Sequence, residues 1–189
     1  MLSILKFLRF IFDKITLRKI LFLFILFVLS IVIGWYIGHI LYSVPKNHVG
    51  DNVANLPSFR KIFFTNYLIA IVLVFLGYLS GGIITVLIII INGFSTGYGI
   101  NYTDISKLGG FTGITYKLIF HAPLELFALF LMGSIGLRGF DLLKGIIKTN
   151  DFSNCKIVIS EQMGYQYFVG SILLLIASYI ENLVIIFSK

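Results

Sequence analysis

The sequence predicts an all-α protein, a polytopic bundle of about five membrane-spanning helices. Hydrophobic residues make up 58% of its 189 residues and charged residues only 12%, about half the charged fraction of an average soluble domain. The apolar residues gather in runs of about 20 residues or more, which is the length that a helix needs to cross a bilayer. Polar segments that carry glycine, proline and charge separate most of these runs.

Residues 1–19 are predicted to form an amphipathic helix that lies in the membrane interface. Ser3, Lys6, Arg9 and Asp13 share one helical stripe, and apolar side chains occupy most of the other side. Basic residues on such a helix meet anionic lipid headgroups, while the apolar face enters the acyl region. The alternative interpretation is a frayed basic flank of the next helix.

The five spans are expected at about 20–42, 63–80, 83–100, 114–140 and 164–188. The uncharged run from 63 to 100 must fold back, because it is about twice as long as one crossing requires. Ser80-Gly81-Gly82 is the expected turn, since adjacent glycines permit the positive backbone dihedral angles of a tight reversal. Residues 111–120 are expected to extend the fourth span or to form a broken, re-entrant half-helix. Residues 20–189 are expected to form a single membrane domain.

The distribution of lysine and arginine predicts the orientation of the chain in the membrane. With a cytoplasmic N terminus, nine of the 15 basic residues fall on the cytoplasmic side and six outside, which favours a cytoplasmic N terminus and an outside C terminus in the cell membrane. The net charge of +7 is scattered among apolar runs. The lipid bilayer, rather than nucleic acid, is therefore the expected partner of these charges.

Polar groups inside the predicted spans mark the candidate site, because a charge at the centre of a spanning helix costs about 2.5–3.5 kcal/mol on insertion scales. Glu125 early in the fourth span and Glu181 late in the fifth fall at comparable depth, and His121 lies one turn before Glu125. With Asn66 and Asn92 they are predicted to converge in one buried polar cluster. Three roles stay open: hydrogen-bonded packing, a proton or substrate relay, and recognition of a partner.

Pro123 predicts a helix start, since proline is tolerated in the first turn of a helix, where its missing N–H costs nothing. Glu125 then becomes a first-turn carboxylate that the helix dipole stabilises. Glycines spaced four apart predict close helix packing, either within the bundle or at a homo-oligomer interface. The glycines expected in such contacts are Gly77, Gly81, Gly93, Gly97, Gly133 and Gly136.

Neither catalysis, nor a cofactor, nor a metal centre is expected. His121 and Glu125 have the i,i+4 spacing of many metal-ligand pairs, but the sequence offers no convincing third ligand, since His39 and His48 lie in or after a different span. The sequence lacks H-E-x-x-H and G-x-S-x-G motifs, and its single Cys155 provides no thiolate set. It also lacks the nucleotide-binding motif G-x-x-x-x-G-K-[ST], so ATP-driven work would require a separate subunit.

The order and spacing of Asn92-Gly93, His121-x3-Glu125-Leu126 and Glu181 resemble the stage II sporulation protein M (SpoIIM) family, over about residues 58–187. Ala122 departs from the glycine that usually follows the histidine in that family. The resemblance implies a polytopic prokaryotic membrane protein. In spore formers such proteins act in a septal peptidoglycan-remodelling complex during engulfment; other relatives accompany ABC-type ATPase genes or circular bacteriocin clusters and are linked to export and immunity.

The favoured function is a non-catalytic, permease-like subunit that works with a separate ATPase in export or immunity. The amphipathic segment 139–152, "GFDLLKGIIKTNDF", is the expected cytoplasmic docking element. The alternative is a membrane scaffold that recruits partner proteins through the outer loop 43–62, as in the engulfment complex.

Overall fold

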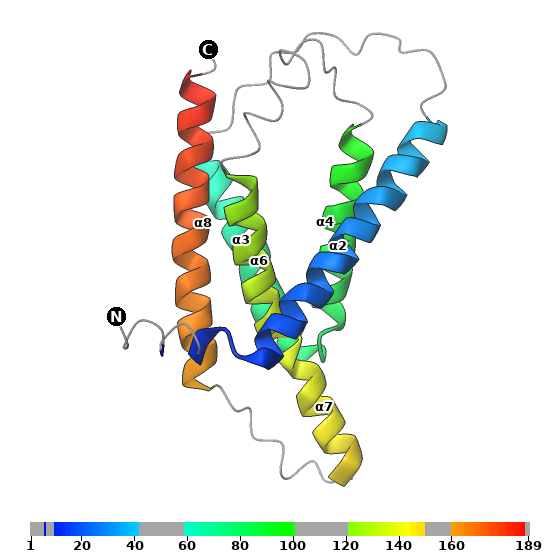
Figure 1. Cartoon of the computed structure of the whole chain (residues 1–189), viewed down its shortest axis with the longest axis vertical. Coiled ribbons are helices and arrows are strands. Elements are labelled where there is room, and N and C mark those ends of the chain that lie inside the picture. Colours follow the sequence, from blue (N-terminus) through cyan, green and yellow to red (C-terminus); the bar gives the residue numbers. More distant parts are fainter. Residues whose placement is uncertain (1–5, 7–9, 42–58, 101–120, 150–159, 188–189) are drawn as a thin grey trace.

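The computed structural model describes residues 6, 10–41, 59–100, 121–149 and 160–187. Its helices are α2 (Lys14–Leu41), α3 (Phe59–Leu79), α4 (Ile83–Ile100), α6 (Ala122–Gly136), α7 (Arg138–Thr149) and α8 (Glu161–Phe187) (Figure 1). Five helical segments are long and apolar enough to cross a membrane, and one of them, Ala122–Gly145, joins α6 to the first turns of α7. The predicted all-α membrane bundle is confirmed. The half-helix predicted at 111–120 and residues 1–5 and 7–9 of the predicted interfacial helix lie outside the described residues.

Helix α2 begins at Lys14 and not at residue 20, where the sequence predicts its start. Asp13 is its N-cap, because the Asp13 carboxylate accepts a hydrogen bond from the backbone N–H of Thr16 at 2.8 Å. The preceding Phe10 and Ile11 are helical, and the helical conformation is interrupted at Phe12 and Asp13. The boundary between the N-terminal segment and the first span therefore lies at Asp13 and not at residue 19.

The turn between α3 and α4 is where the paired glycines predict it. Gly81 and Gly82 have φ angles of 64° and 87°, in the left-handed region that favours glycine. The N–H of Gly82 donates to the carbonyl of Gly77 at 2.7 Å, and the Ser80 hydroxyl accepts from the N–H of Ile84 at 3.0 Å. These bonds satisfy backbone groups that the ends of two helices would otherwise leave free in an apolar surrounding.

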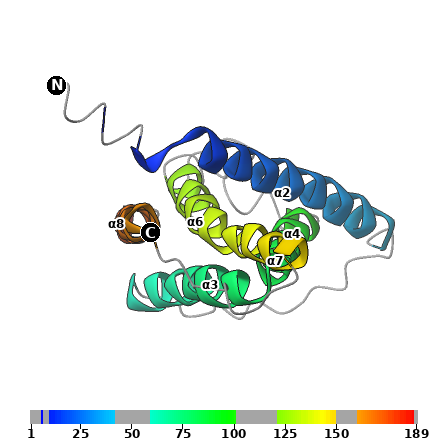
Figure 2. The same cartoon turned by 90° about the horizontal axis from the view of Figure 1, so that it is seen from below.

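Helix α6 is the centre of the bundle. All residues from Ala128 to Gly136 are buried, which is typical of a helix that is covered on every side. Helices α2, α3 and α8 pack around it (Figure 2). The surrounding helices bury only part of their circumference, and large apolar side chains on their outer faces, such as Phe22, Phe75 and Phe168, are exposed. These faces are the surface that lipid would cover.

Helices α2 and α4 approach closely because glycines line their contact. A Cβ atom on Gly97 would collide with the backbone carbonyl of Ile31, and one on Gly34 would collide with that of Phe94. A Cβ on Gly93 would lie 2.6 Å from the carbonyl oxygen of Phe27. In lipid, where helices associate by van der Waals contact, such close backbone approach is a main source of packing energy.

Helix α7 continues from α6 with only Leu137 between them, and it runs past the ends of the other helices (Figure 1). A Cβ on Gly139 would collide with the backbone of Tyr78, so α7 begins in close contact with the end of α3. Its Asp141 forms an ion pair with Lys19 of α2. The first turn of α7 is thus fixed to the bundle, while its last turns extend beyond it.

Candidate functional site

The site begins at the N-terminus of α6. His121 is the N-cap residue, and Pro123 lies in the first turn, as predicted. The carbonyl of His121 accepts the N–H of Glu125 at 3.0 Å, whereas its side chain makes no capping hydrogen bond. The backbone of His121 therefore belongs to the first turn of α6, but its imidazole does not cap the helix.

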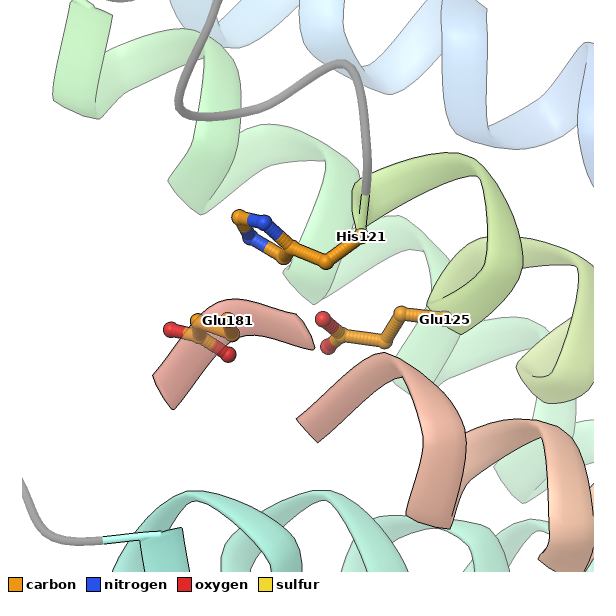
Figure 3. Close-up of side chains that lie close together, drawn as sticks. All are labelled: His121, Glu125 and Glu181. Carbon is orange, nitrogen blue, oxygen red and sulfur yellow. The ribbon is translucent and has the colours of Figure 1, made fainter. Parts of the chain in front are cut away.

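The structure brings His121 and Glu125 of α6 together with Glu181 of α8. One ligand atom from each residue lies within 4.8 Å of the other two. Figure 3 shows the side chains of His121 and Glu125 extending toward the segment of α8 that carries Glu181. We call these three residues the His-Glu-Glu cluster. It lies at the end of the bundle opposite α7, where α6 begins and α8 ends (Figure 1).

The cluster contains a buried polar atom that has no hydrogen-bond partner among the described residues. His121 is only 8% exposed, and its buried Nδ1 atom has no hydrogen-bond partner among the residues that the structure describes. Glu125 and Glu181 are half-buried. In the described ranges, no lysine or arginine forms an ion pair with either glutamate. Since buried polar atoms are normally paired, the cluster is suited to share protons or to bind a cationic group.

The predicted five-residue cluster also included Asn66 and Asn92. Asn66 adjoins Tyr67, whose hydroxyl is 2.7 Å from that of Tyr167, and Tyr167 precedes Glu181 by about 20 Å along α8. Asn92 belongs to α4, which packs against α2 on the far side of α6 from α8 (Figure 2). The prediction is wrong for Asn92, because depth alone does not determine which helices are neighbours. For Asn66, which lies on a helix that packs against both α6 and α8, it stays a prediction.

The predicted packing glycines lie at helix contacts, with one exception. Gly77 and Gly136 face each other where α3 meets α6, and a Cβ on Gly136 would collide with the carbonyl of Leu73. Gly133 faces Leu23 of α2, and Gly93 and Gly97 face α2. Gly81 instead belongs to the turn after α3, where its positive φ favours glycine; a Cβ there would also meet the side chain of Leu143 of α7.

A second polar network, which the sequence does not predict, lies at the opposite end of the bundle. Gln166 of α8 is fully buried and donates to the carbonyl of Ile11 at 2.7 Å and to the Thr16 hydroxyl at 2.9 Å. Arg138 donates to the Gln162 side chain at 2.8 Å and to Thr16 at 3.3 Å. These bonds connect the starts of α2, α7 and α8. The presence of Gln166, a polar residue, inside a predicted span could have indicated this network.

Asp13 belongs to the same network and its pKa lies below its usual value of 3.8. Burial works to raise this pKa, but hydrogen bonds from Thr16 and the nearby positive charge of Arg138 outweigh it. The lowered pKa shows that the folded chain favours the ionised carboxylate. Asp13 therefore has two roles: it caps α2 and it balances the charge of Arg138.

Comparison with known proteins identifies the chain through its family. No curated protein and no solved structure matches it. The family model described as "Stage II sporulation protein M" matches residues 23–184, a range that contains most of the first spanning segment, the other four in full and the whole His-Glu-Glu cluster. The chain belongs to the stage II sporulation protein M family.

Proposed function

We propose that this protein is a non-catalytic, permease-like membrane subunit that works with a separate ATPase in export or immunity. The observation that carries the proposal is the continuity of α6 and α7. Helix α6 starts at the His-Glu-Glu cluster, runs through the centre of the bundle and leads into α7 after Leu137. A partner bound to α7 would therefore act on the helix that carries two residues of the cluster.

Helix α7 has the chemistry of a docking element. Phe140 and Ile147 are 60% and 79% exposed, and their spacing of seven residues places them on one face of the helix. Asp141, Lys144 and Lys148 are also exposed. Because α7 continues in the direction of α6 (Figure 1), its outer turns project from the bundle. This supports a protein partner over a helix that lies flat in the lipid interface.

The proposal requires α7 on the cytoplasmic side, where ATP is present. The charge bias of the sequence supports a cytoplasmic N terminus and an outside C terminus. The single Cys155 follows α7 in the chain and is a native reporter of this orientation. A thiol reagent that does not cross membranes should label it in inverted vesicles and not in intact cells. Labelling in intact cells would contradict the proposed orientation.

Reconstitution in lipid nanodiscs tests the pairing with an ATPase. The protein is purified with the ABC-type ATPase encoded nearest to its gene, and copurification and ATP hydrolysis are measured. Wild-type protein should capture the ATPase and stimulate hydrolysis, and Ile147→Ser should lose both. Ile83→Ser is the matched control, because Ile83 is 62% exposed at the start of α4 but is not part of α7. Equal behaviour of the two variants, or no capture by wild-type protein, would reject the proposal.

The scaffold alternative depends on the loop 43–62, and residues 42–58 lie outside the described structure. No contact or exposed surface of the described residues favours it over the permease-like role. Crosslinking from positions in this loop separates the two functions, since a scaffold should yield protein adducts there and a permease subunit should yield mainly lipid adducts.

A further inference from the structure

We propose that His121, Glu125 and Glu181 bind one divalent transition-metal ion, with Zn²⁺ as the best match, between α6 and α8. The sequence provides the pair His121 and Glu125 but no evident third ligand. The fold provides it, since Glu181 comes from a helix distant in the sequence. This inference goes beyond the proposed function and does not depend on it.

The positions of the donor atoms fit a site that closes on an ion. Zinc binds histidine nitrogen and carboxylate oxygen at about 2.0–2.2 Å, so donors in a tetrahedral site are separated by about 3.4 Å. The three donor atoms lie within 4.8 Å of one another. Small rotations of the two flexible glutamate side chains would shift their carboxylates by roughly 1 Å and bring the donor atoms to bonding positions.

The backbone fixes two of the ligands before any ion binds. His121 is the N-cap of α6 and Glu125 lies one turn later, a spacing that places both side chains on the same face of the helix. The buried Nδ1 of His121 lacks a partner among the described residues, and a neutral imidazole nitrogen of this kind is a common metal ligand. A metal bond would satisfy an atom that burial otherwise makes costly.

Charge also favours a dication. Two carboxylates within 4.8 Å of each other would repel strongly in a surrounding of low dielectric constant when both are ionised. One divalent ion would neutralise them. The positive end of the α6 dipole opposes a cation, but its equivalent of about half a charge is smaller than the two negative charges of the glutamates.

The donor set selects the class of ion. One imidazole and two carboxylates suit Zn²⁺ or Mn²⁺, whereas Ca²⁺ takes six to eight oxygen ligands. The cluster contains no thiolate, so soft-metal binding is not favoured. Three protein ligands leave one position of a tetrahedral site open for water or for a group from a partner or substrate.

Metal binding to the full-length protein tests this inference without any assay of transport. Protein without a histidine tag is purified in detergent, stripped with a chelator and titrated with Co²⁺, whose visible absorption reports its ligands. We expect one equivalent to bind with the spectrum of nitrogen and oxygen ligation, and Zn²⁺ to displace it. Zn²⁺ should also raise the unfolding temperature, because an ion that binds only the folded state stabilises it.

Variants locate the ion. Glu181→Gln should weaken Co²⁺ binding roughly ten-fold or more, because it removes a charged ligand. Glu161→Gln is the matched control, since Glu161 is an exposed glutamate at the other end of α8, and it should bind as wild-type protein does. The inference is overturned if wild-type protein neither binds Co²⁺ nor gains stability from Zn²⁺, or if Glu181→Gln binds equally well. If Glu181→Gln fails to fold, the Co²⁺ titration of wild-type protein alone tests whether the metal binds.

Discussion

Glu125 of α6 and Glu181 of α8 approach each other within 4.8 Å at one end of the bundle. Two like charges at this separation destabilise the fold unless a proton or a cation accompanies them. Neither glutamate forms an ion pair with a lysine or arginine in the part of the chain that the structure describes. The pair is therefore a poor structural element by itself, which supports its interpretation as a site that binds something.

Replacement of Gly97 by alanine should destabilise the bundle by about 1–3 kcal/mol. The new Cβ would collide with the backbone carbonyl of Ile31, and backbone cannot rotate away as a side chain can. Gly99→Ala is the control on the same helix, because its Cβ would meet nothing within 4 Å. Unfolding in detergent measures both variants; equal loss of stability would contradict the close α2–α4 contact.

The hydrogen bond between the hydroxyls of Tyr67 and Tyr167, 2.7 Å apart, should couple α3 to α8 by about 0.6 kcal/mol, the average for such bonds inside membrane proteins. A double-mutant cycle of Tyr67→Phe and Tyr167→Phe, measured by reversible unfolding in mixed micelles, gives this coupling directly. A coupling energy of zero would show that the two hydroxyls do not interact in the folded protein.

Substitution of the N-cap by Asp13→Ala should cost about 1 kcal/mol of stability at neutral pH. The pKa of Asp13 is lowered in the folded state from 3.8, so its contribution is present above pH 3.8 and is lost as the pH falls through the lower folded value. The gap between wild-type and variant unfolding temperatures should accordingly narrow in acid below that pH. A gap that widened in acid would contradict this linkage.

Hydropathy and local chemistry predict most of the fold. Apolar runs locate the five spans, Gly81 and Gly82 determine the turn after α3, and Pro123 marks the start of α6. These features depend on interactions within a few residues, which a sequence displays directly. The start of α2 differs from the predicted residue 20, because Asp13 caps this helix and does not lie on the polar stripe of a preceding one.

Helix neighbours are harder to predict. In lipid every helix has an apolar surface, so composition does not show that α6 is central or that α4 packs on α2 rather than on α8. For this reason the sequence predicts that Glu125 and Glu181 lie at similar depth, but it wrongly predicts that Asn92 lies beside them. Nor does it predict the role of Gln166, whose partners Ile11 and Thr16 lie at the other end of the chain.

We propose that the His-Glu-Glu cluster is a working site of a membrane subunit and not only a helix contact. The decisive measurement is the ATP hydrolysis of Glu181→Gln protein that is reconstituted in nanodiscs with the neighbouring ATPase. In metal-free buffer the variant should unfold at a temperature at least as high as wild-type protein does, since glutamine keeps the shape and removes a repulsive charge. It should still capture the ATPase through α7 but lose most of the stimulated ATP hydrolysis. Wild-type stimulation by a correctly folded Glu181→Gln protein would contradict the claim.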